Sequence, residues 1–121
     1  MPPMFRLTLI GAAGWALATV GLRLLPVWPQ PALAAGLVVL ILLAALIAFV
    51  GWLVRGLPRQ DRPAGAIAVA LPGMIGDAFA SAHFAQMFPN AAPSLGGWFA
   101  GLMLVGYAAI LAGGLVASRR D

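Results

Sequence analysis

The sequence has no cysteine, no lysine and no glutamate among its 121 residues. Without cysteine, the chain has no disulfide scaffold, no thiolate metal site and no cysteine nucleophile. Charged residues, all of them arginine or aspartate, make up only 8% of the chain. A soluble domain has about a quarter of its residues charged, so this shortage excludes that class. The 63% share of hydrophobic residues likewise excludes an intrinsically disordered chain.

Apolar residues instead fill four stretches, each with the roughly 20 residues that a helix needs to cross the hydrocarbon core. The sequence therefore predicts an all-α fold: an integral membrane four-helix bundle, formed by a single transmembrane domain over residues 1–121. The helices are expected at about 4–25, 32–54, 64–88 and 95–118. Helix-breaking residues separate them in three clusters: Pro26, Pro29 and Pro31; Gly56, Pro58 and Pro63; Pro89, Asn90 and Pro93.

Arginine is concentrated on one side of this arrangement. A path of four helices puts six of the seven arginines on the same face of the membrane: Arg6, Arg55, Arg59, Arg62, Arg119 and Arg120. Positive residues accumulate in cytoplasmic segments, so we expect a protein of the cell (cytoplasmic) membrane with both its N- and C-termini in the cytoplasm. Arg23 and the prolines before Ala32 argue against a cleaved signal peptide in the first stretch.

Asp77 is the one acidic residue inside an expected membrane helix. A carboxylate there costs about 2.5–3.5 kcal/mol on insertion scales, so we expect it to face the bundle interior, towards the first helix. Two interpretations stay open: a proton-accepting or cation-binding site, and a hydrogen-bonded residue that holds helices together. Pro72 frees the carbonyl of Ala68, and the third helix is therefore expected to be kinked at Pro72.

A line of polar residues follows one face of the first helix. Its members have helical spacing: Thr8, Ala12, Trp15, Thr19 and Arg23. Arg23 either extends to the headgroups or pairs with Asp77 or an anionic ligand. Ser81 shares a helical face with Asp77, and His83 lies nearer the outer end. We predict a small polar pocket that opens towards the outer leaflet, with these candidate residues: Asp77, Ser81, Arg23, Thr19 and His83.

The remaining patterns carry no chemistry. One histidine and three aspartates are too few for a metal centre, so we expect neither a metal nor a cofactor. Small residues one turn apart let helix backbones approach closely, inside the bundle or between copies. The last helix has three such motifs: Gly97-x-x-x-Gly101, Ala109-x-x-x-Gly113 and Gly114-x-x-x-Ser118.

Length and helix number resemble those of the small multidrug-resistance exporters. Those exporters depend on a glutamate in their first helix, and this sequence has no glutamate, so that resemblance supplies no transport site. The whole chain looks more like an uncharacterised bacterial family, a domain of unknown function, of small four-span integral membrane proteins. Three features carry this resemblance: the line from Trp15 to Arg23, Leu71-Pro72-Gly73-Met74 followed by Asp77, and Phe88-Pro89-Asn90. It implies the topology but no activity.

No nucleophile with an adjacent base is evident, so we do not expect an enzyme. The expected function is that of a small multi-pass inner-membrane protein with a structural or accessory role, or of an interaction subunit. The alternative is a small oligomeric transporter or proton-coupled carrier that uses Asp77. The expected partners are the lipid bilayer and either a second copy of the chain, as a homo-oligomer, or another membrane protein. Nucleic acid is not expected, because the arginines report membrane orientation.

Overall fold

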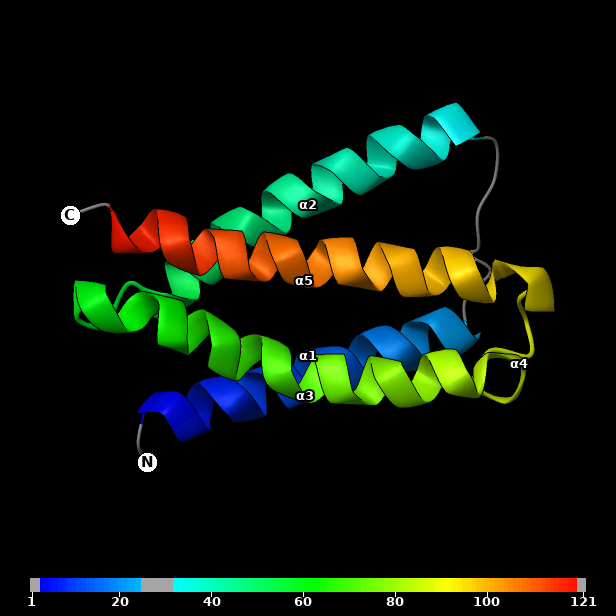
Figure 1. Ribbon diagram of the computed structural model, residues 1–121, viewed down its shortest axis with the longest axis horizontal. Coiled ribbons are helices and arrows are strands. Elements are labelled where there is room, and N and C mark those ends of the chain that lie inside the picture. Colours follow the sequence, from blue (N-terminus) through cyan, green and yellow to red (C-terminus); the bar gives the residue numbers. More distant parts are fainter. Residues whose placement is uncertain (1–2, 25–31, 120–121) are drawn as a thin grey trace.

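The computed structural model describes residues 3–24 and 32–119, most of which are helical and none of which is in a strand. Four long helices run along the molecule (Figure 1): α1 (Pro3–Leu24), α2 (Ala32–Val54), α3 (Arg62–Ala82) and α5 (Gly96–Ser118). The single turn α4 (Phe84–Met87) follows α3, and the 3-10 turns η1 (Arg59–Asp61) and η2 (Pro93–Leu95) precede α3 and α5. The predicted proline-rich connection 26–31 and Arg120 lie outside the described residues.

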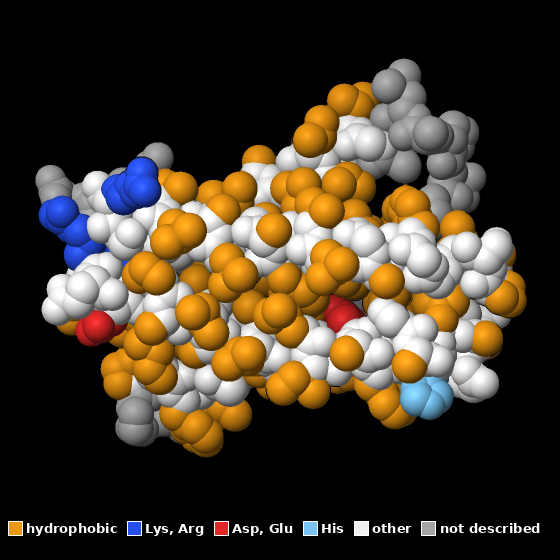
Figure 2. Space-filling model, viewed as in Figure 1, with side chains coloured by type: hydrophobic (Ala, Val, Ile, Leu, Met, Phe, Trp, Pro, Cys, Tyr) orange, Lys and Arg blue, Asp and Glu red, His pale blue; other side chains and the backbone are white. Residues whose placement is uncertain are grey.

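The surface of the helices is apolar over most of its length. Three stretches are long and apolar enough to cross a membrane, Pro3–Leu24, Arg59–Ala82 and Pro93–Ser118, and a shorter apolar stretch, Val39–Val54, lies in α2. Figure 2 shows hydrophobic side chains along the molecule and arginines gathered at one end. Large side chains such as Leu17 and Ile75 are more than two-thirds exposed, at 76% and 72%. These features fit a small membrane protein.

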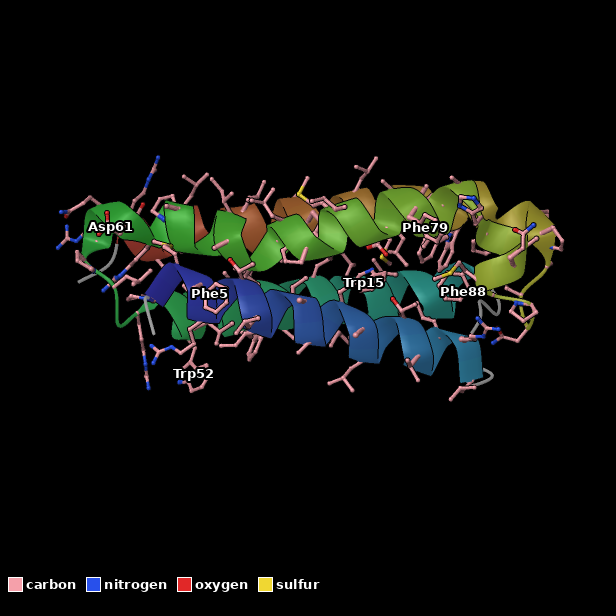
Figure 3. The ribbon with its side chains drawn as sticks, turned by 90° about the horizontal axis from the view of Figure 1, so that it is seen from below. Phe5, Trp15, Trp52, Asp61, Phe79 and Phe88 are labelled. Carbon is pink, nitrogen blue, oxygen red and sulfur yellow. The ribbon has the colours of Figure 1, made fainter. Side chains whose placement is uncertain are left out.

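The long helices pack in three main pairs. Helix α3 lies against both α1 and α5, and α5 lies against α2, whereas α1 and α2 make few direct contacts. Figure 3 shows the pair α1 and α2 below the pair α3 and α5, and Figure 1 shows α2 diverging from α5 towards its N-terminal end. The molecule therefore has an open side between α1 and α2.

Glycines allow the close approach in each of these pairs. An added Cβ atom at any of them would collide with the neighbouring helix: Gly11 would meet Val69, Gly114 would meet Ala66, and Gly113 would meet the carbonyl oxygen of Ile47. Two of the predicted small-residue motifs, those at 109–113 and 114–118, thus contribute to helix contacts. For the third motif, an added Cβ atom at Gly97 or Gly101 would meet no other described residue within 4 Å.

The predicted third helix, 64–88, is divided. Helix α3 ends at Ala82, His83 leaves the helical conformation, and residues 84–87 form the separate turn α4. The physical reason is a buried aromatic cluster, because Phe84 and Phe88 turn inwards and pack on Phe99 with ring centroids 5.5 and 5.1 Å away. Asn90 follows the turn and donates a hydrogen bond of 2.8 Å to the carbonyl of Leu22, which ties this segment to the end of α1.

Candidate functional site

Asp77 is the one polar or charged side chain that is buried among the described residues, with 6% of its surface exposed. It lies in α3, five residues before that helix ends at Ala82. The indole Nε1 of Trp15 in α1 donates a 2.8 Å hydrogen bond to its Oδ1 atom. The hydroxyl of Tyr107 in α5 donates to its Oδ2 atom. One carboxylate therefore joins three helices, and each of its oxygens accepts a hydrogen bond.

The glycines just before Asp77 make room for both donors. A Cβ atom at Gly76 would collide with the indole ring of Trp15, 2.5 Å from its Cζ2 atom. A Cβ atom at Gly73 would lie 2.5 Å from the hydroxyl oxygen of Tyr107. Real Cβ contacts are never this short, so any larger residue would force the aromatic side chains away from the carboxylate. These two glycines thus leave the space in which the two hydrogen-bond donors lie.

The site lies near the middle of α1 and α5, although it is close to the C-terminal end of α3. Tyr107 is the central residue of α5, which runs from Gly96 to Ser118. Figure 3 shows Trp15 between α1 and α3, well away from either end of the molecule. The sequence placed Asp77 at the centre of a helix running to residue 88, and the end of α3 at Ala82 shifts it towards one end of its own helix.

A cavity of about 320 Å³ adjoins Asp77 on the open side between α1 and α2. Residues of all four long helices line it, and the wall is apolar apart from Asp77, Thr19, Tyr107 and the indole nitrogen of Trp15. Phe49 of α2 adds a third aromatic ring to the lining. Its volume is at the lower end of the range for small-molecule sites, about 300–1,000 Å³.

A second cavity reaches Asp77 from the opposite side of the α3–α5 pair. It measures about 220 Å³ and is lined by Ser81, Met74, Leu104 and Tyr107 together with Asp77. Asp77 and Tyr107 therefore stand between the two cavities and form part of the wall of each. The carboxylate is buried within the fold but has access to space on two sides.

The predicted pocket residues separate into two groups. Thr19 lines the larger cavity and Ser81 the smaller one, each together with Asp77. Arg23 and His83 line neither of these cavities. Arg23 is exposed near the end of α1, and the ring of His83 is exposed and stacks on Phe79 with centroids 4.3 Å apart. At the other end of the polar line, Thr8 donates to the Met4 carbonyl of its own helix.

Asp77 keeps further capacity to accept hydrogen bonds. An ionised carboxylate has about four acceptor positions, and two of them are used here. Both of its partners in the described chain are neutral groups, an indole and a phenol, so its charge has no cationic partner there. Within residues 3–24 and 32–119, no three His, Cys, Asp or Glu side chains gather where they could hold a metal ion.

Sequence reasoning missed Tyr107. Two signals pointed to it: Tyr107 is the only tyrosine in the chain, and it lies in the middle of an apolar helix. A phenolic hydroxyl in that position needs a hydrogen-bond partner. Spacing within one helix cannot find this pair, because Asp77 and Tyr107 are 30 residues apart and belong to different helices.

An all-helical chain with three helices apolar enough to cross a bilayer, and a buried carboxylate between them, fits the class of small membrane proteins. The chain belongs to the family of unknown function DUF5367, whose model matches residues 27–121. The resemblance to an uncharacterised family is thereby confirmed. The match includes Pro72, Asp77 and Tyr107 but not Trp15, which precedes it. No curated protein and no solved structure matches the chain.

Proposed function

We propose that this chain is a multi-pass protein of the cytoplasmic membrane with four membrane-spanning helices. Helix α2 crosses the membrane in addition to α1, α3 and α5. Helix α2 supports this topology because its 23 residues include no charged side chain and it packs along α5. The arginine-rich end faces the cytoplasm, and both termini lie there. We also place a bend in α3 at Pro72, which has no N–H group to donate to the carbonyl of Ala68.

Within that topology, the chain binds a hydrophobic organic cation next to Asp77 and acts as a carrier in which the cation and a proton compete for the carboxylate. One observation carries this proposal: the Asp77 carboxylate, without a cationic partner among the described residues, forms part of the wall of an apolar cavity of about 320 Å³. A charge inside a membrane faces a cavity or a partner and marks a site for an ion or a proton.

The lining of the cavity suits such a ligand. Apolar side chains accommodate hydrocarbon groups, and the negative charge selects a cation over an anion of the same shape. Trp15, Tyr107 and Phe49 add aromatic rings to the lining, and aromatic rings attract cations through their quadrupoles. The bonds from Trp15 and Tyr107 hold the carboxylate in place while its remaining acceptor positions stay available.

Equilibrium dialysis of the purified protein in mild detergent, against protein-free micelles, tests the proposal. The probe is tetraphenylphosphonium, and tetraphenylborate is the control with the same shape and the opposite charge. We expect saturable binding of the cation only. Asp77→Asn should weaken it at least tenfold, which corresponds to about 1.4 kcal/mol.

A pair of glycine variants tests whether the cavity itself is the site. Gly14 lines the cavity and Gly21 does not, and at both positions an added Cβ atom would meet no other described residue within 4 Å. Gly14→Leu should therefore fill the cavity and abolish binding, whereas Gly21→Leu should bind like the unmodified chain. Equal binding of the cation by Gly14→Leu and Gly21→Leu, or by Asp77→Asn and the unmodified chain, would reject the proposal.

A structural or accessory role is the second candidate, and the two hydrogen bonds to Asp77 favour it. They join α1, α3 and α5, which is a sufficient reason for a carboxylate in this position. In that case the cation does not bind, Asp77→Asn leaves a cellular phenotype unchanged, and Asp77→Leu unfolds the protein. The dialysis experiment and these two variants together separate the two candidates.

We propose no enzymatic reaction. The described partners of Asp77 are an indole and a phenol, which make no pair of nucleophile and base.

We also propose that the chain works as a homo-oligomer or with another membrane protein, since the few contacts between α1 and α2 leave the cavity open on one side. Mass analysis after purification in mild detergent distinguishes a single chain, a self-associated chain and a complex.

A further inference from the structure

A third cavity lies between α2 and α5 at the arginine-rich end of the molecule, separate from the Asp77 site. Its volume is about 720 Å³, larger than either cavity beside Asp77. Small residues form much of its wall, with Ala44, Ala48 and Gly51 on α2 and Gly113 on α5. Two arginines, Arg55 and Arg62, lie at its polar end.

The two arginines differ in what holds them. The guanidinium of Arg62 donates hydrogen bonds to three backbone carbonyls, including that of Ala117 at 2.7 Å, and so connects the end of α5 with the α2–α3 turn. The side chain of Arg55 is exposed, and its guanidinium lies over the ring of Trp52, 5.4 Å from the centroid. Figure 3 shows Trp52 projecting away from the helices at this end. Arg55 and Trp52 thus form an exposed cationic and aromatic rim.

We propose that this cavity, the α2–α5 groove, binds an anionic phospholipid, with its phosphate at Arg55 and Arg62 and one acyl chain along Ala48 and Gly51. The positive charge of Arg55 and Arg62 is complementary to a phosphate, and the exposed guanidinium of Arg55 can bind it through paired donors. Tryptophan favours the headgroup level, which puts the rim at the depth of the phosphates. Basic pockets between membrane helices are suited to anionic headgroups.

The length of the groove supports an acyl chain as its apolar occupant. From Ala44 to Val54, the last residue of α2 before Arg55, the helix rises about 15 Å, at roughly 1.5 Å for each residue. One leaflet of the hydrocarbon core is about 15 Å thick, half of the total. A chain in the groove would therefore run from the rim to the middle of the bilayer. An inorganic phosphate would fill the rim alone and leave the apolar part empty.

Native mass spectrometry after mild detergent extraction tests the proposal. The protein is reconstituted with equal amounts of phosphatidylglycerol and phosphatidylethanolamine, and the lipids that remain bound are counted. We expect one phosphatidylglycerol per chain to be retained in at least fivefold excess over phosphatidylethanolamine. Arg55→Gln should remove this preference. Arg59→Gln removes the same charge from the same connection between α2 and α3, but Arg59 does not line the groove, so this variant should retain the preference.

A second pair of variants tests the apolar part. Gly51 lines the groove and Gly101 lines none of the three cavities, and at both positions an added Cβ would meet no neighbouring group of the described residues within 4 Å. Gly51→Leu should lose the retained lipid and Gly101→Leu should keep it. Retention by Gly51→Leu, or equal losses in Arg55→Gln and Arg59→Gln, would overturn the proposal in favour of diffuse attraction to charge. Displacement of the lipid by inorganic phosphate alone would show an anion site and would also overturn it.

Discussion

At the scale of single residues, Asp77 is the main determinant of the site, because a buried carboxylate needs hydrogen-bond donors to be stable. A charge-assisted hydrogen bond is stronger than a neutral one, and an oxygen left without its donor loses that stabilisation in a medium without water. Trp15 and Tyr107 each supply one donor, from different helices. The stability of the fold and the position of the carboxylate in the proposed site therefore depend on the same three side chains.

Trp15→Phe and Tyr107→Phe should each lower the free energy of unfolding in detergent by about 1–2 kcal/mol, because each removes one donor and little volume. The double variant should lose less than the sum of the two, since the bonds share one carboxylate. Chemical unfolding followed by fluorescence or circular dichroism measures all three. Trp52→Phe is the control, because Trp52 is 55% exposed and makes no contact with Asp77. A loss as large in Trp52→Phe as in Trp15→Phe would contradict the assigned role of the donors.

At the scale of the elements, α3 is the helix that connects α1 with the other long helices, because it packs against both α1 and α5. Its sequence Pro72-Gly73-Met74-Ile75-Gly76-Asp77 predicts a weakened helix, and the structure adds a second use for the two glycines. They form shallow places on the helix surface in which the ring of Trp15 and the hydroxyl of Tyr107 lie. The same two glycines therefore weaken α3 and make room for the side chains that bind Asp77.

Gly76→Ala tests this use of α3. The new methyl group would collide with the indole of Trp15, so we expect a loss of about 1–3 kcal/mol in the free energy of unfolding. Gly101→Ala is the matched control, since its methyl group would meet open space. It should be neutral or stabilise the protein by up to about 1 kcal/mol through helix propensity. If the two substitutions change the free energy of unfolding equally, the space at Gly76 is not what allows Trp15 to pack there.

Sequence patterns predicted the elements more fully than the contacts between them. Hydrophobic length and proline clusters place α1, α2 and α5 within about two residues of their observed bounds. The division after Ala82 was missed, because apolar residues continue to Phe88 and only the packing of three phenylalanines accounts for the turn. Asp77 was found because a charge in an apolar helix stands out. Tyr107 was not, because its pairing depends on how α5 packs against α3.

At the scale of the whole molecule, polarity is distributed along the long axis. The described arginines other than Arg23 lie at the end where α1 begins and α5 finishes. The cluster of Phe84, Phe88 and Phe99 lies at the other end, and Asp77 lies between the two ends. The same arrangement gives the proposed cation site a position within the membrane and gives the proposed lipid site a position at its surface. Both proposals therefore require that α3 crosses the bilayer.

Cysteine labelling in intact cells tests that requirement most directly, since the native chain has no cysteine to interfere. Gln60→Cys places a thiol in the turn before α3, and Ser94→Cys places one in the turn before α5. We predict that a membrane-impermeant maleimide labels the cysteine at position 94 from outside and reaches the one at position 60 only after permeabilisation. Labelling of both positions from the same side would show that α3 does not cross the membrane, and would contradict the placement of Asp77 inside it.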